Sequence, residues 1–191
     1  NKKMCGPSMI LAEIGTHAYH LLRYVTELEV TEVCAEVSSL SPELLIDDNA
    51  FIILRMQKKA RASIWVSSAA TGGENGLKIR VYGTKGSVEW FQDDPNILKY
   101  IELNKSMKII TRANNEVSDM SLNSSRLAAG HPEGFFEAFA NIYTEFSEAI
   151  LSNKKNNKKT FPGIVDGVKG IKFIFAAKRS SNKNSNWIKL K

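Results

Sequence analysis

The stretch VYGTKGSVEWFQDD, residues 81–94, shows how this chain is expected to fold. Its tetrapeptide Gly83-Thr84-Lys85-Gly86 separates two short runs of β-branched and aromatic residues, which is typical of a hairpin turn. Similar runs extend from Glu29 to about Ile110, with turn signals such as Ser41-Pro42 and Gly72-Gly73 between them. Successive strands joined by short turns pair antiparallel, because parallel strands need long crossovers. The sequence therefore predicts an antiparallel meander of about six strands.

Helical periodicity appears on both sides of this strand region. One predicted helix covers Met9 to about Tyr24, with Ser8 as its candidate N-cap. The others cover Pro132 to about Leu151 and Asp166 to Arg179, and a polar surface loop is predicted over 114–130. A block of strands flanked by helices predicts an α+β fold, with helices on one face of an open, mainly antiparallel sheet.

Length and composition restrict the class of protein. The chain has 191 residues, 43% of them hydrophobic, and a net charge of +6, which excludes wholesale disorder and a collagen. We expect a single α+β domain over 1–191 with a polar tail over 180–191. Two cysteines are too few for a disulfide framework. No apolar run approaches the ~18 residues of a membrane helix, so the prediction is a cytoplasmic protein with no membrane partner.

Two phosphate-binding motifs are missing from the sequence. No G-x-G-x-x-G opens a βαβ unit, and Gly83–Ser87 (GTKGS) has the wrong spacing for a phosphate loop. Residues 83–86 also match the GXXG pattern with which a KH domain clamps a nucleic-acid backbone. That clamp joins two helices, whereas this segment joins two predicted strands, so a KH domain is excluded. No cofactor-binding residue is therefore predicted in this chain.

The three histidines carry the candidate chemistry. Glu13, His17 and His20 lie at i, i+4 and i+7, which places them on one face of a helix. A carboxylate one turn from an imidazole can fix its tautomer and raise its basicity. This spacing fits an acid–base pair in which His17 is the base and Glu13 its partner, but taken alone it favours an interior histidine with a helix-surface ion pair. A metal site made of Glu13, His17 and His20 also fits the spacing, but the sequence shows no further groups to orient such ligands, so no metal is predicted. His131 is either a loop residue near the cleft or a helix-capping or surface residue.

Four segments resemble the C-terminal domain of the glucose–fructose oxidoreductase, inositol dehydrogenase and MocA (Gfo/Idh/MocA) family. The first is GPSMILAEIGTHAYHLLRYVTELEV, residues 6–30, which resembles the first helix of that domain. The others are VYGTKGSVEWFQDDPN, GHPEGFFEAFANIY and FPGIVDGVKGIKFIFAAKRSSN. They occur in the family order and extend the likeness from about Gly6 to Trp187.

The resemblance implies a two-domain dehydrogenase in which an N-terminal Rossmann domain binds NAD or NADP. The substrate, a sugar, polyol or derivative, then lies between the domains. His17 matches the family histidine that takes the proton from the substrate hydroxyl. The family pattern D-x-G-x-H has aspartate where this chain has Glu13, and the extra methylene moves the carboxylate by about one C–C bond, a misplacement that can cost up to about 100-fold in rate. Tyr19, His20 and His131 are candidate substrate contacts.

Further expectations concern the state of the chain and its partners. As a fragment lacking the nucleotide-binding domain, it is expected to bind no cofactor tightly and to be inactive alone. The family resemblance implies a homodimer or higher oligomer formed through the open sheet. One alternative is an oligomerisation scaffold whose catalysis has lapsed or changed at Glu13. Another is a nucleic-acid module using Lys154, Lys155, Lys158 and Lys159, but no aromatics interleave these lysines to stack on bases, so no nucleic-acid partner is predicted.

Overall fold

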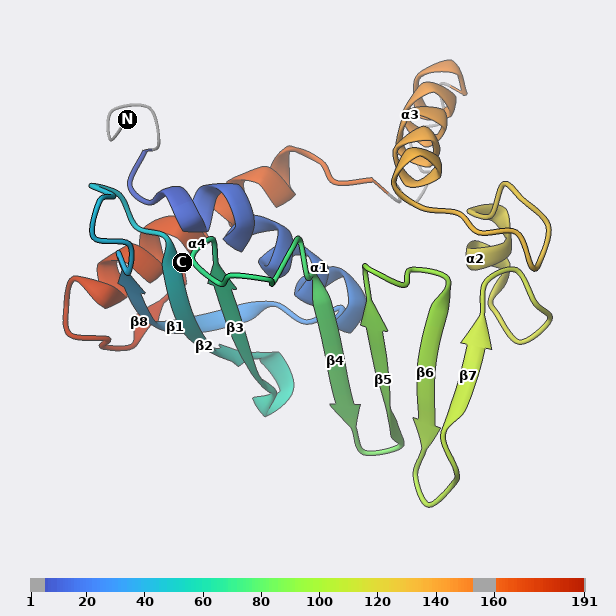
Figure 1. The fold of residues 1–191 in the computed structure, drawn as a ribbon, viewed down its shortest axis with the longest axis horizontal. Helices are drawn as coiled ribbons and strands as arrows, with labels where there is room; N and C mark the ends of the chain where they lie inside the picture. Colours follow the sequence, from blue (N-terminus) through green and yellow to red (C-terminus); the bar gives the residue numbers. More distant parts are fainter. Residues whose placement is uncertain (1–5, 153–160, 191) are drawn as a thin grey trace. The chain divides into compact units, whose positions relative to one another are not determined.

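The chain forms two compact units of α+β structure in the computed structural model, which describes residues 6–152 and 161–190 (Figure 1). The first unit contains residues 6–74 and 163–190, and the second contains residues 75–152 with 161–162. The lysines at 154, 155, 158 and 159 lie outside the described residues.

The predicted fold class is confirmed, and every pair of neighbouring strands is antiparallel. The strands are more numerous than expected. Eight strands form two four-stranded sheets, one in each unit, instead of about six in a single sheet. The glycine-rich segment before Lys78 separates the third strand from the fourth, and the division into units falls within that segment.

The sheet of the first unit has the strand order β3-β2-β1-β8. Its strands are β1 (Val30–Ser38), β2 (Asn49–Met56), β3 (Arg61–Ser67) and β8 (Ile188–Lys189), with the 3-10 turn η2 (Gln57–Lys59) between β2 and β3. Alternate residues of β2 are buried, as expected for a sheet with one covered face. The opposite face remains open, and it carries Phe51, Ile53 and Trp65, which are all more than half exposed.

Helices cover one face of this sheet. The chain enters through the π-helical turn η1 (Leu11–Gly15), continues as α1 (Thr16–Thr26) and returns as α4 (Ile164–Ser181). The Tyr19 ring stacks on Phe173 with centroids 4.3 Å apart. Both rings belong to the apolar core that also contains Val33 of β1 and Leu54 of β2. The predicted first and last helices are thus held together by the sheet that they cover.

Residues 180–190 are integrated into the first unit instead of forming a polar tail. The buried Ser180 hydroxyl accepts from the Ala35 N–H at 2.9 Å and donates to the Asn186 carbonyl at 2.7 Å. Strand β8 then pairs with β1. The segment looks like a tail in the sequence because its polar groups satisfy backbone groups, a role that leaves no hydrophobic pattern.

The second unit is a meander with strand order β4-β5-β6-β7. The strands are β4 (Lys78–Gly83), β5 (Gly86–Phe91), β6 (Ile97–Glu102) and β7 (Lys108–Thr111), followed by α2 (Asp119–Asn123) and α3 (Phe135–Leu151). Gly83 pairs with Gly86 across the first turn, which confirms the predicted hairpin. No helix in the described residues is both long and apolar enough to cross a bilayer.

Candidate active site

The helix that carries Glu13 and His17 is anchored at its start. Ser8 is its N-cap, as predicted, because its Oγ accepts from the Leu11 N–H at 3.3 Å. The same hydroxyl donates to Asp47 Oδ1 at 2.8 Å, and the Ile10 N–H donates to that oxygen at 3.0 Å. Lys178 Nζ pairs with Asp47 Oδ2 at 3.1 Å. One carboxylate therefore fixes the helix start to the last helix of the unit.

The first helix contains a wide turn at the candidate site. Over Leu11–Gly15 it is π-helical, and the Thr16 N–H reaches back five residues to the Leu11 carbonyl. The Thr16 hydroxyl donates to the Ala12 carbonyl at 2.9 Å. Single π-helical turns inside α-helices occur frequently at functional sites. Glu13 lies within this turn and His17 follows directly after it, a feature that spacing alone does not predict.

Glu13 and His17 both have exposed side chains on this helix. Among the described residues, neither side chain makes a hydrogen bond or an ion pair, so the carboxylate and the imidazole are not joined to one another. The imidazole is therefore not sealed in the apolar interior. An unpaired carboxylate and imidazole one turn apart are available to a ligand.

Tyr19 is a core residue, and this corrects its prediction as a substrate contact. Its side chain is only 1% exposed, and its hydroxyl is buried without a hydrogen-bond partner in the described part of the chain. Burial raises the pKa of Tyr19 to about 12, although the nearby Arg23 guanidinium acts in the opposite direction. A ring with no free surface cannot contact a substrate, so Tyr19 has no part in the site proposed below.

His20 is half-buried and lies near Asp166 at the start of α4. The pKa of Asp166 is below its usual range, chiefly because the Gly163 backbone N–H donates to it, with Arg23 and His20 adding to the effect. His20 therefore shares a helix with His17 but has a different carboxylate neighbour. The described residues contain no group of three or more His, Cys, Asp or Glu side chains placed to hold a metal ion.

A hollow of about 320 Å³ lies at the N-terminal end of the same helix. Ser8, Asp47 and Lys178 are among its lining residues, and the others belong to the segments 6–9, 37–39 and 44–46. Glu13 and His17 do not line it. In the first unit taken by itself, these two side chains thus lie on an open helix face.

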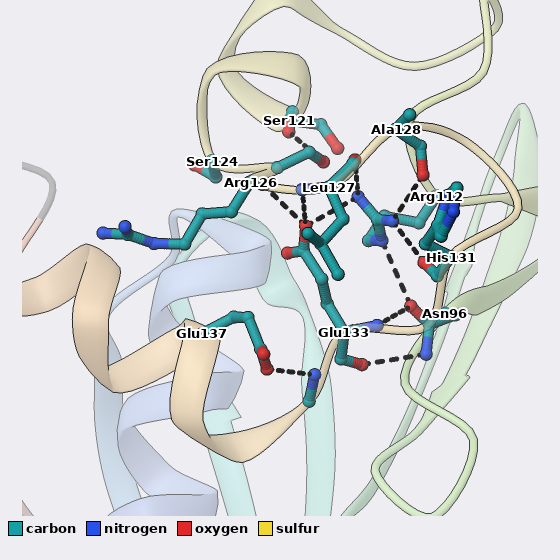
Figure 2. Close-up of polar contacts among 12 residues, drawn as sticks. Asn96, Arg112, Ser121, Ser124, Arg126, Leu127, Ala128, His131, Glu133 and Glu137 are labelled. Atoms are coloured by element: carbon teal, nitrogen blue, oxygen red, sulfur yellow. Dashed lines mark hydrogen bonds and ion pairs between the residues drawn. The ribbon is translucent and has the colours of Figure 1, made fainter.

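His131 belongs to the second unit, where a polar network holds the loop before α3 (Figure 2). Its carbonyl accepts from Arg112 Nη2 at 2.5 Å, and its N–H donates to the Ala128 carbonyl at 3.2 Å. Its side chain is exposed. The structure therefore brings Glu13, His17 and His20 onto one helix and places His131 in the other unit.

Sequence reasoning missed Arg112, Glu133 and Asn96, which form the centre of that network. In the sequence, Glu133 is simply an acidic residue in the first turn of the helix predicted over 132–151. The three residues are separated by sixteen and twenty-one positions along the chain, so no helical or strand spacing connects them. The polar character of the 114–130 loop was the only signal.

Comparison with known proteins identifies the family. Residues 1–190 match the Gfo/Idh/MocA family described as "Oxidoreductase family, C-terminal alpha/beta domain". The chain belongs to this family. The "Uncharacterized oxidoreductase YfiI" of Bacillus subtilis (strain 168) is 31% identical over 195 residues, a match that covers 98% of this chain and 50% of that protein.

Solved structures show the same fold. An oxidoreductase from Sinorhizobium meliloti is 42% identical with a TM-score of 0.89, covering 92% of this chain and 51% of that one. An inositol dehydrogenase homolog from Azotobacter vinelandii, complexed with NADH and myo-inositol, is 27% identical with a TM-score of 0.84. The match covers 96% of this chain and 50% of that one. The chain thus spans about half the length of the relatives that it matches.

Proposed function

We propose that this chain is the substrate-binding half of an NAD(P)-dependent oxidoreductase acting on a sugar, a polyol or a derivative. The observation that carries the proposal is the exposed, unpaired imidazole of His17, next to a π-helical turn of the family's first helix. Family membership and a similar protein complexed with NADH and myo-inositol support the reaction class. The proposal places the enzyme in the cytoplasm.

His17 acts as the base in this proposal. Its neutral imidazole accepts the proton of a substrate hydroxyl, and the carboxylate of Glu13 stabilises the imidazolium that forms. A nicotinamide bound by the intact enzyme would supply the hydride acceptor for the carbon that carries this hydroxyl. No residue of this chain is assigned to the nucleotide, because the sequence has no G-x-G-x-x-G motif. Nucleotide binding is assigned to the other half of the enzyme.

His20 and His131 are the proposed contacts to substrate hydroxyls. Both imidazoles can donate and accept hydrogen bonds. His20 lies one turn from His17 and is half-buried, and His131 is exposed on a loop whose backbone is fixed. Neither is assigned a proton-transfer step.

A homodimer or higher oligomer formed through the open sheet is part of the proposal. Phe51 and Trp65 stack on its exposed face with centroids 5.9 Å apart, and both are more than half exposed. Contiguous exposed apolar patches of this kind are typical of protein interfaces. Light scattering on the intact protein and on Trp65→Glu tests this, with a loss of mass expected for the variant and an unchanged mass contradicting it.

A scaffold with lapsed or altered catalysis is the second candidate function. It is favoured by one observation: Glu13, which replaces the family aspartate, makes no hydrogen bond to His17. Glu13→Asp in the intact protein separates the two functions. A large gain in turnover from a nearly inactive wild type would support the scaffold, whereas an active wild type supports the enzyme.

The isolated chain and the intact protein give complementary tests. Titration of the isolated chain with NADH is expected to show no sub-millimolar binding. The intact protein is expected to reduce NAD or NADP with a sugar or polyol, and His17→Ala is expected to abolish most of that turnover. Unchanged turnover in His17→Ala would remove His17 from the mechanism.

A further inference from the structure

The guanidinium of Arg112 contacts both the loop before α3 and Asn96, which precedes β6. Nε donates to Asn96 Oδ1 at 3.2 Å, Nη1 to the Leu127 carbonyl at 2.9 Å, and Nη2 to the carbonyls of Ala128 and His131 at 3.2 and 2.5 Å. Nη1 also pairs with Glu133 at 3.0 Å. A guanidinium has five N–H donors, and four hydrogen bonds and one ion pair engage this one. A lysine could not replace this arrangement, since it lacks the planar fork of donors.

Glu133 holds the other side of the same loop. Its side chain is only 7% exposed, and that of Arg112 is 14% exposed. Besides Arg112, the carboxylate accepts from the backbone N–H groups of Arg126, at 2.6 Å, and Leu127. The Asn96 side chain accepts from the Glu133 N–H at 3.0 Å and donates to its carbonyl at 2.9 Å. Figure 2 shows these contacts converging on the segment between Arg126 and Glu133.

His131 is the residue whose backbone this network fixes. Its N–H closes a turn onto the Ala128 carbonyl, and Gly130 has the positive φ of 85° that the third position of a type II turn requires. Its carbonyl is held by Arg112, and Pro132 restricts its backbone further. The dashed contacts in Figure 2 reach His131 only at that carbonyl. Among the described residues no hydrogen bond engages the imidazole, which is exposed.

His131 thus has a backbone held in place and an imidazole that makes no hydrogen bond within the described part of the chain, and this combination is typical of a preorganised ligand contact. Ordering a loop costs conformational entropy, and a contact that is already ordered binds without that cost. The geometry points to Arg112 as a positioning residue that holds His131 ready for a substrate hydroxyl, with Glu133 fixing Arg112 in turn. This role rests on the proposed function, and it adds a specificity determinant to it.

A double-mutant cycle on the intact enzyme tests the role. Arg112→Lys and His131→Ala are each expected to raise KM for the sugar or polyol about tenfold with kcat changed less than about twofold, the pattern of a lost binding contact. If Arg112 acts through His131, the double variant is no worse than either single variant. Arg126→Lys is the matched control. Arg126 ties the same loop to α3 through Asn141 and Thr144, and its KM is expected to stay within about twofold of wild type.

The outcomes separate this role from simple loop stabilisation. Additive effects of Arg112→Lys and His131→Ala on KM, or a KM for Arg112→Lys equal to that of wild type, would overturn it. If Arg112→Lys does not fold, Glu133→Gln replaces it. The amide keeps one oxygen to accept from the backbone N–H groups of Arg126 and Leu127, while the charge is lost and the second oxygen becomes an NH2 group. The same non-additivity with His131→Ala is then expected. A wild type that oxidises no sugar or polyol overturns the proposed function first, whereas an active wild type with additive effects overturns only this role.

Discussion

Arg23 and Glu29 form a bidentate pair in the first unit, with Nε to Oε2 and Nη2 to Oε1 both at 2.9 Å. Lys169 Nζ lies 2.7 Å from the same Glu29 carboxylate, and Asp166 accepts from Arg23 at 3.4 Å. The cluster joins the end of α1, the segment before β1 and the start of α4. It lies one turn beyond His20, so it stabilises the frame of the candidate site without contributing to the chemistry.

Glu29→Gln is expected to remove a stability contribution that depends on pH. The hydrogen bonds from Arg23 lower the pKa of Glu29 from 4.5 to about 2. Because the folded pKa is depressed, the contribution is fully present above pH 4.5 and is lost as the pH falls towards 2. The carboxylate is 40% exposed, so solvent screening limits the contribution to about 1 kcal/mol. Urea unfolding of wild type and Glu29→Gln should show a difference in unfolding free energy at pH 7 that disappears by about pH 2.

Glu36→Gln is the control for this measurement. Glu36 is an exposed residue of β1 for which the described residues show no ion pair. The unfolding free energy of the Glu36→Gln variant is expected to follow that of wild type across the same pH range. If the difference in unfolding free energy between wild type and Glu29→Gln stays constant from pH 7 to pH 2, the assigned interaction is contradicted.

Asp47→Ala is expected to destabilise the first unit by about 2 kcal/mol, since it removes a helix-capping acceptor and leaves Lys178 without its partner. The Asp47 side chain is only 9% exposed. Thermal unfolding measures the effect, with Glu43→Ala as a control on an exposed side chain of the same loop. Equal melting temperatures for the two variants would show that Asp47 does not anchor the helix.

Gly86→Ala is expected to destabilise the second unit, whereas Gly83→Ala is expected to be mild. A Cβ at Gly86 would lie 2.2 Å from the Ile101 carbonyl oxygen of the neighbouring strand, but a Cβ at Gly83 would make its nearest contact at 3.5 Å. The backbone must shift in the first case, at a cost of about 3 kcal/mol. Chemical unfolding of both variants tests the difference, and a Gly86→Ala variant as stable as Gly83→Ala would rule out the close strand contact.

Local patterns were sufficient to predict most elements of this fold. The GTKG turn between Gly83 and Gly86, the alternation along the strands and the three helical segments depend on neighbours in sequence, and the structure has each of them. The pairing of β8 with β1 depends on residues about 155 positions apart. A two-residue strand in a polar segment has no periodicity from which it could be predicted.

The candidate site shows the same limit. Spacing places Glu13, His17 and His20 on one helix face. Tyr19, a candidate substrate contact suggested beside the family resemblance, lies two residues beyond His17. Two residues turn an α-helix by about 200°, so Tyr19 faces the core, and this orientation can be predicted from the sequence.

The Arg112 network cannot be predicted from the sequence, because its acceptors are mainly backbone carbonyls, which have no side-chain signature.

The turnover of His17→Ala in the intact protein tests the central claim most directly. With the sugar or polyol that the wild type oxidises fastest, NADH or NADPH formation is followed by absorbance, and nucleotide binding is checked by fluorescence. Loss of a general base is expected to lower kcat by about 10²–10⁴-fold with nucleotide affinity unchanged. A kcat within about twofold of wild type would contradict the assignment of His17 as the base.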